Sequence, residues 1–400
     1  NLNLDLVGRY TDSNKEFDAP DYSSLVPTYL PADSSDESRV KQGYFGAGGT
    51  LKLLGDRWPQ SLRAAWTTTD TDTWNNSGDQ GSTAADIYGL YYQTSWQFTP
   101  GALDSPGNSV TFAAVHEQQD FQQRGPVNPN QDQEQRTTGA VLELVLSPLA
   151  QTYMSLSARY DHNSAYDSVA TYRATTAWTA ESTRSRLHAS YGTGQKAPTF
   201  TERFGYYPDQ FVGNPDLKPE TSKGWEIGID QPFFDDRVNL GATYFHENLE
   251  DEILTVFIDA PPPVFFLSTT ENLAGTSKRR GVEVTAGARV TEGLRFSGSY
   301  TYLDATEPDR NTGEPAREIR RPWHVASLNG DWRLLGNKAD VNLNMTYVGD
   351  QDDTFFGVNG SESVNLDAYY LASLAISYRL TEQARVYTRV ENLLDQSYED

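Results

Sequence analysis

The sequence contains no cysteine, which excludes a disulfide scaffold and any metal site built on thiolates. Basic residues are also scarce: 32 Lys and Arg stand against 55 Asp and Glu, giving a net charge of -23. That balance argues against nucleic acid as a partner. The five histidines show no pair at metal-ligand spacing, so we expect lumen or interface residues rather than ligands: His116, His162, His188, His246 and His324.

Long apolar runs are absent as well. The best candidate, 253–267, is interrupted by Asp259 and by three consecutive prolines at 261–263. A transmembrane helix needs roughly 20 successive apolar residues, so the sequence excludes helical spans. A spanning β-strand needs only about 9–11 residues, half of them apolar, and a mean hydropathy of -0.62 is compatible with that.

What the sequence does contain is strict alternation of apolar and polar residues. In 341–347, Val341, Leu343 and Met345 point to one side, and Asn342 and Asn344 point to the other. The same period recurs in 2–8, 152–160, 238–246, 282–290 and 294–302. Such strands lie between two solvents, which favours an all-β protein: a transmembrane antiparallel β-barrel with lipid outside and water or polar protein inside.

The pattern predicts about 18 strands, all antiparallel. Their approximate cores are 1–10, 41–53, 60–69, 86–98, 108–119, 137–147, 151–161, 168–179, 184–194, 222–230, 236–247, 251–258, 265–272, 280–290, 293–303, 323–333, 338–349 and 369–380, with one more at 383–393.

Short and long connections alternate along the chain. The short ones lie at 234–237, 291–293, 335–338 and 381–383, and the long ones at 197–221, 304–322 and 350–367. Outer-membrane barrels have short periplasmic turns and longer extracellular loops. The 23 Tyr and 8 Trp would supply aromatic girdles at the two interfaces, although aromatic residues also simply suit β-strands.

Alternation also predicts which side chains face the lumen. If Trp225 and Ile227 face lipid, Glu226 faces inward, and if Leu187 faces lipid, His188 faces inward. A barrel of about 18 strands is too wide for its own side chains to fill. The lumen therefore either conducts or holds another domain.

Three segments resemble a known family. Residues 191–200 (YGTGQKAPTF), followed by 213–222 (GNPDLKPETS), resemble the "KAP … NPxLKPE" signature of TonB-dependent outer-membrane receptors. Residues 390–398 (VENLLDQSY) resemble the "ENLxDxxYE" segment near the end of that family's barrel. Since prolines fix extended backbone, we expect these motifs to shape a loop rather than contact a ligand directly.

The resemblance implies active import across the outer membrane of a Gram-negative bacterium. Family members have a barrel of about 22 strands, a plug domain in the lumen and a short box that engages TonB. Here 1–400 would be the barrel domain, with the plug and the last strand absent. Asn1 lies directly in a strand-like segment with no signal peptide before it, so we expect a part of a longer chain.

Within the family, the order of segments is most similar to the vitamin B12 receptors, which makes cobalamin the expected ligand. An iron-siderophore receptor is the alternative, because siderophore receptors share nearly all the same signatures. Haem receptors carry a His between the "AP" and "NPxL" boxes, whereas 199–213 contain none. The expected partners are thus outer-membrane lipid, TonB and cobalamin or an iron chelate.

The resemblance also suggests calcium, with no other cofactor expected. Residues 8–18 are similar to an Asp-rich loop of the vitamin B12 receptors in which carboxylates bind calcium. The candidate ligands, from loops we expect to be adjacent, are Asp12, Asp18, Asp70 and Asp72, with Asp33, Asp36 and Asp79 nearby. A solvated acidic loop is the alternative, since Asp70-Thr71-Asp72 matches no complete calcium-loop motif.

Other classes fit less well. A passive porin would lack the motif boxes, and a soluble β-protein would have to bury its apolar faces. An outer-membrane enzyme would need a catalytic cluster. His188 and Ser190 are two residues apart on one expected strand, which does not make a triad. We therefore expect no enzymatic activity.

Overall fold

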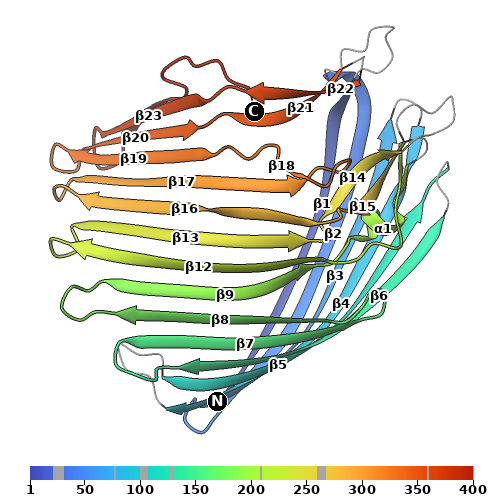
Figure 1. Ribbon diagram of the computed structural model, residues 1–400, viewed down its shortest axis with the longest axis horizontal. Coiled ribbons are helices and arrows are strands. Elements are labelled where there is room, and N and C mark those ends of the chain that lie inside the picture. The colour runs from blue at the N-terminus through green and yellow to red at the C-terminus, as the bar shows by residue number, and fades with distance from the viewer. Residues whose placement is uncertain are drawn as a thin grey trace.

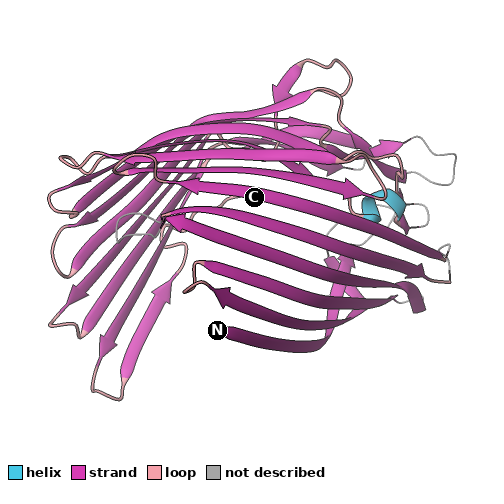
Figure 2. Ribbon diagram, turned by 90° about the horizontal axis from the view of Figure 1, so that it is seen from below, coloured by secondary structure: helices cyan, strands magenta, loops and turns pink. Residues whose placement is uncertain are grey.

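A computed structural model describes residues 1–20, 31–75, 78–99, 107–126, 130–207, 210–258, 267–357 and 360–399. One 18-stranded antiparallel sheet dominates it and curls round like the wall of a barrel (Figures 1 and 2). In spatial order its strands are β1 (Leu2–Pro20), β2 (Pro31–Leu53), β3 (Trp58–Asn75), β4 (Gly78–Thr99), β5 (Asn108–Arg124), β6 (Gln131–Leu146), β7 (Thr152–Asn163), β8 (Val169–Thr179), β9 (Arg186–Lys196), β12 (Glu220–Phe233), β13 (Val238–Glu250), β16 (Thr276–Arg289), β17 (Leu294–Pro308) with the short β18 (Pro315–Arg317), β19 (His324–Leu334), β20 (Ala339–Val348), β23 (Tyr369–Arg379) and β24 (Arg385–Val390).

Each long strand of this sheet pairs with the next long strand of the chain, as the predicted antiparallel meander requires. In the part of the chain that the structure describes, β1 pairs with β2 alone and β24 pairs with β23 alone, so these two strands form the edges of the sheet.

Two predicted strands are not part of the wall. Residues 251–258 and 265–272 were expected to span the barrel, but β14 (Ile253–Ile258) and β15 (Leu267–Asn272) pair with each other instead. With six residues each, they are shorter than the roughly 9–11 that a crossing needs. They join β10 (Tyr206–Tyr207) and β11 (Phe211–Val212) in a four-stranded sheet. Asp259 and the prolines at 261–263 lie outside the described residues.

The remaining elements are a hairpin, β21 (Gln351–Gly357) with β22 (Gly360–Leu366), and the helix α1 (Phe200–Phe204). None of the helical segments in the described ranges has the length and apolar character needed to cross a membrane.

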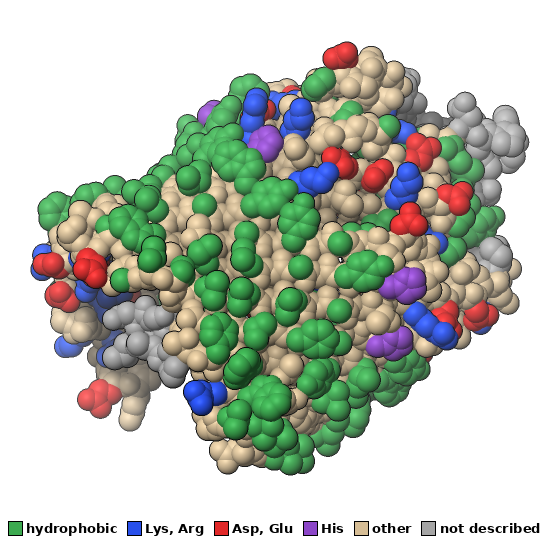
Figure 3. Space-filling view, turned by 60° about the horizontal axis from the view of Figure 1, so that its bottom comes forward, with side chains coloured by type: hydrophobic (Ala, Val, Ile, Leu, Met, Phe, Trp, Pro, Cys, Tyr) green, Lys and Arg blue, Asp and Glu red, His purple; other side chains and the backbone are tan. Residues whose placement is uncertain are grey.

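The outer wall of the barrel is apolar. Leu2, Leu4 and Leu6 are 64–73% exposed on the edge strand β1, and Ile227 is 56% exposed on β12 although that strand is paired on both sides. Figure 3 shows hydrophobic side chains spread over this wall, with charged side chains gathered towards its ends. This pattern confirms the predicted barrel, because a large apolar surface that contacts no other part of the chain suits a hydrocarbon environment.

The two ends of the barrel differ as predicted. At one end the strands are joined by tight turns with left-handed backbone, for example at Phe234–Asp236 (φ 53 to 66°) and Leu335–Asn337 (φ 54 to 65°). At the other end lie α1, β14, β15 and the β21–β22 hairpin (Figure 1). We refer to these as the turn end and the loop end. Binding residues concentrate on loops held by a rigid scaffold, so the loop end is the place to look for a site.

Candidate functional site

The segment that follows β9 folds back against the inner wall at the loop end. Its helix α1 begins with a capping box: Glu202 N donates to Thr199 Oγ1 at 3.1 Å, and Thr199 N donates to Glu202 Oε2 at 2.7 Å. Phe200 then stacks on Phe121 of β5, with ring centroids 5.4 Å apart and an interplanar angle of 8°. Residues far apart in the sequence are thereby fixed against each other.

Glutamines of the wall reinforce this contact. Gln123 Nε2 donates to Tyr206 O at 3.0 Å, and Gln131 Nε2 donates to Phe204 O. Gln131 also donates to Gln123 Oε1 at 2.7 Å. These amides therefore hold the segment to the wall through its backbone carbonyl groups.

The second half of the "KAP … NPxLKPE" signature holds the other side of α1. Asn214 Nδ2 donates to Thr270 O at 3.0 Å, and Leu217 is buried. Arg203 donates to Pro215 O at 3.1 Å, and burial lowers the pKa of its guanidinium. These contacts agree with the interpretation that the motifs shape a loop.

A cavity of ≈ 400 Å³ lies between this segment and the inner wall. Its lining comes from β5, β6, β7, the β7–β8 turn and the start of the segment: Val115, Glu117, Gln119, Gln135, Thr137, Arg159, Tyr166, Ala197, Pro198, Thr199 and Phe200. We call this the 197–200 cavity. Sequence reasoning missed this cavity. The available signal was that the odd-numbered residues of 117–119 and 131–137 are all polar, and alternation places them on the luminal side.

An ion-pair network ties the outer loops together. Arg279 on β16 pairs with Glu252 at 3.1 Å and with Glu318 at 2.7 Å, and Arg321 pairs with Glu318 at 3.0 Å. Burial, and then the charges of Glu318 and Glu252, raise the pKa of Glu307 beside them. The network joins β16 to the segments that follow β13 and β18, and so fixes the rim around the lumen.

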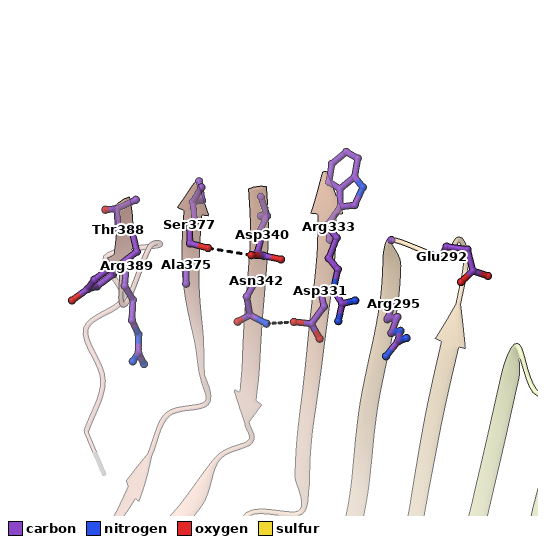
Figure 4. Close-up of a pocket in the computed structure, with 15 residues that line it drawn as sticks. Glu292, Arg295, Asp331, Arg333, Asp340, Asn342, Ala375, Ser377, Thr388 and Arg389 are labelled. Carbon is purple, nitrogen blue, oxygen red and sulfur yellow. Dashed lines mark hydrogen bonds between the residues drawn. The ribbon is translucent and has the colours of Figure 1, made fainter. Parts of the chain in front are cut away.

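A second cavity, of ≈ 470 Å³, lies on the inner wall at the turn end. Figure 4 shows side chains from β17, β19, β20 and β23–β24 lining it, with Asp331 accepting from Asn342 at 2.8 Å and Asp340 accepting from Ser377 at 3.3 Å. Arg295, Arg333 and Arg389 contribute positive charge. The lumen is therefore lined by charges of both signs, as predicted.

The calcium candidates lie on strands, not in the loops that we expected. β3 extends through these positions because the alternating Thr and Asp residues of 69–73 continue its pairing with β2 and β4. Register places Asp12 opposite Lys41, and Lys41 opposite Asp70, while Asp72 lies opposite Arg39.

Three of the four carboxylates therefore share one patch. Asp12 lies on the same side of β1 as Leu6 and Tyr10, so the patch faces away from the lumen. Arg39 contacts Asp12 at 2.6 Å, and this hydrogen bond holds the pKa of the Asp12 carboxyl below its usual value.

Asp18 lies six residues further along β1, roughly 20 Å from Asp12, and accepts from Ser34 N at 3.3 Å. Within the described ranges, no group of three or more His, Asp or Glu side chains is arranged to hold a metal ion.

His188 and Ser190 do not form a catalytic pair. Both face the lumen from β9, but His188 Nε2 lies 3.8 Å from Asp230, whereas Ser190 donates to Glu226 at 2.9 Å. The two side chains contact different carboxylates, as the two-residue spacing predicted.

Comparison with known proteins gives consistent results. Residues 1–393 match the family model described as "TonB dependent receptor-like, beta-barrel". The chain is 31% identical over 250 residues to the vitamin B12 transporter BtuB of Photobacterium profundum, a match that covers 60% of this chain and 36% of that protein.

Two solved structures share the fold. The siderophore receptor PirA of Acinetobacter baumannii has a TM-score of 0.76 at 17% identity, covering 98% of this chain and 64% of PirA. The ferric-catecholate import receptor Fiu of E. coli K12 has a TM-score of 0.71 at 14% identity, covering 99% of this chain and 68% of Fiu.

Proposed function

The chain belongs to the TonB-dependent receptor β-barrel family, and on that premise we propose that it forms the wall of a receptor that imports a corrinoid with energy from TonB. The family consists of transporters, not enzymes, and its barrels lie in the outer membrane of Gram-negative bacteria. The matched part of this chain spans only about a third of the vitamin B12 transporter. We propose that residues 1–400 form the barrel domain, and that a plug domain and a final strand belong to the same protein.

The observation that supports a corrinoid is the 31% identity with a vitamin B12 transporter, since the structural matches to siderophore receptors, at 17% identity or less, establish the fold alone. An iron-siderophore complex is the second candidate, because siderophore receptors share this barrel and nearly all of its sequence signatures, so neither separates the two ligands. In both cases the ligand would enter at the loop end and pass through the polar lumen.

Binding of cyanocobalamin to the whole receptor in isolated outer membranes tests this proposal. We expect saturable binding of cyanocobalamin, and vitamin B12-dependent growth that is lost when the receptor or TonB is deleted. Ferric catecholates and hydroxamates are measured alongside as alternative ligands. Saturable binding of an iron chelate together with no binding of cyanocobalamin would transfer the assignment to siderophores.

Calcium remains part of the proposal. The patch of Asp12, Asp70 and Asp72 offers carboxylate oxygens, the ligands that Ca²⁺ prefers, but Asp12 would have to leave Arg39 to coordinate an ion. A calcium effect on corrinoid binding would thus be accompanied by rearrangement of β1 against β2.

A further inference from the structure

Arginine side chains gather on the luminal face of the wall at the turn end. The register of β16–β24 places six of them on the same face as the luminal residue Asn342: Arg289, Arg295, Arg333, Arg379, Arg385 and Arg389. All six are exposed, and we call this set the arginine arc. The ≈ 470 Å³ cavity lies within the arc, and Figure 4 shows Arg295, Arg333 and Arg389 around it on three separate strands.

Four of these arginines have no counter-charge. Arg385 pairs with Asp340 at 3.2 Å, and Arg389 pairs with Glu391 at 2.8 Å. Within the described ranges, the other guanidinium groups form neither an ion pair nor a side-chain hydrogen bond: Arg289, Arg295, Arg333 and Arg379.

The register also places like charges directly opposite each other. Arg289 lies opposite Arg295, and Arg379 lies opposite Arg385. Like charges in this arrangement destabilise a sheet. Asp331 lies opposite Arg295 on its other side, but it accepts from two asparagine amides rather than from an arginine. The wall thus holds positive charge here that its own carboxylates do not neutralise.

The sign of this charge is opposite to that of the whole chain. In the described part of the wall, the six arginines are accompanied by four carboxylates, which leaves an excess of two positive charges where the chain has -23: Glu292, Asp331, Asp340 and Glu391. The arc covers six neighbouring strands, so it is about 24 Å wide. A single small anion would reach only a few of its arginines. Carboxylates spread over a protein surface would match the whole arc.

The rest of the receptor is placed to supply such a surface. The chain covers 64% of PirA and 68% of Fiu, so both solved relatives are longer. Asn1 lies at the turn end, because its amino group donates to Lys52 O at 3.2 Å and Lys52 precedes the left-handed turn at 54–56. A domain that precedes Asn1 would therefore join the wall at the end where the arc lies.

We propose that the arginine arc is the docking surface for an acidic face of the plug domain, whose carboxylates pair with the four arginines that lack a counter-charge. This proposal rests on the proposed function, in which a plug belongs to the same protein, and it names the part of the wall that holds the plug. Arginine binds carboxylates through two parallel hydrogen bonds, which fix orientation as well as charge. Since the ligand would leave the lumen at the turn end, docking here closes the exit.

The test measures hydrogen exchange of the whole receptor in lipid nanodiscs, with docking read as protection of the residues that precede Asn1. Changing Arg295 and Arg333 together to Gln should lower this protection about 5- to 30-fold, the effect of losing two partly solvated ion pairs. Changing both to Lys keeps the charge and should restore most of it. Arg9→Gln with Arg173→Gln is the matched control. It removes two exposed luminal arginines that also lack an ion pair in the described ranges but lie outside the arc, on β1 and β8, and it should leave the protection unchanged.

Salt provides a second readout that is specific to charge. The screening length falls from about 10 Å at 0.1 M to about 3 Å at 1 M salt, so native protection should fall over this range and that of the Gln variant should fall less. Heat-modifiable mobility on gels verifies that each barrel has folded. Native protection in the Gln variant, or an equal loss in the control, would overturn the docking proposal while the transport function stands. If the native receptor has no protected domain before Asn1, the plug proposal itself fails, and the docking proposal fails with it.

Discussion

Gly139 of β6 faces Asp161 of β7 across the sheet, and the Asp161 carboxylate occupies the space that a side chain at position 139 would need. A Cβ atom on Gly139 would collide with Asp161 Oδ1 and lie 2.9 Å from Arg159 Nη2. The glycine thus allows the Arg159–Asp161 pair to lie flat against the inner wall, at the edge of the 197–200 cavity.

We therefore expect Gly139→Ala to displace this ion pair. The contacts involve ends of flexible side chains, so the barrel should still assemble, but the rearranged cavity should bind cyanocobalamin several-fold more weakly. Gly287→Ala is the matched control, because a Cβ atom on Gly287 meets nothing within 4 Å. Equal affinities of the two variants would show that the position of the Arg159–Asp161 pair does not affect binding.

Leu343→Arg should impair insertion into the membrane. Leu343 lies midway along β20 on the outward side, in register with Leu374. A cation on the lipid face at the bilayer midplane costs about 2–4 kcal/mol. The fraction of heat-modifiable barrel in the outer membrane measures the effect, and Asn344→Arg, which points into the lumen, should assemble normally. A defect of equal size in both variants would mean that the facing assignment of β20 is wrong.

How far the sequence predicts this fold is illustrated by the segment 341–347. There each side chain faces as alternation requires. A strand with lipid on one side and a polar lumen on the other needs apolar and polar residues in turn, so its sequence alone reveals which side chains face outward. Strands do form at 253–258 and 267–272, but no local signal shows that β14 and β15 pair with each other away from the wall.

The candidate site is less predictable, for a physical reason. Gln135, Tyr166 and Phe200 lie on separate parts of the chain, and they meet only because the segment after β9 folds inward. Likewise, Asp12 and Asp70 share a row only through the register of β2 with both neighbours. Register and inward folding are tertiary properties that a motif does not encode by itself.

Acidification should stabilise the ion-pair network at the loop end. Since the folded state raises the pKa of Glu307, it holds a proton more tightly than the unfolded state does. The contribution of Glu307 to stability is therefore greatest when the pH lies below the ordinary pKa of a glutamate. It is lost as the pH rises through the raised pKa that Glu307 has in the folded state.

Glu307→Gln should remove this dependence and strengthen the network at neutral pH, because Arg279 and Arg321 would then balance Glu252 and Glu318 alone. Hydrogen exchange of 303–318 against pH measures the effect. Glu314→Gln, at an exposed position between β17 and β18, is the control. Protection that falls with pH to the same extent in native protein and Glu307→Gln would contradict the assignment.

Calcium should tighten corrinoid binding if the Asp12 patch coordinates it. Changing Asp12 and Asp72 together to Ala should then abolish the calcium effect, whereas Asp18→Ala should leave it intact, because Asp18 lies apart from the patch. Affinities measured with calcium and with a chelator give the answer. A calcium effect that persists in the double variant would place the ion elsewhere, and no calcium effect in the native receptor would remove the ion from the proposal.

The most direct test of the account uses the absence of native cysteine. Single cysteines at each position from 341 to 346 can carry a nitroxide label in the membrane-embedded receptor, and its accessibility to oxygen and to a water-soluble nickel complex is measured by spin-label spectroscopy. A lipid-facing outer wall around a polar lumen predicts that labels at 341, 343 and 345 favour oxygen, while those at 342, 344 and 346 favour nickel. Accessibilities without a two-residue period, or with the opposite phase, would contradict it.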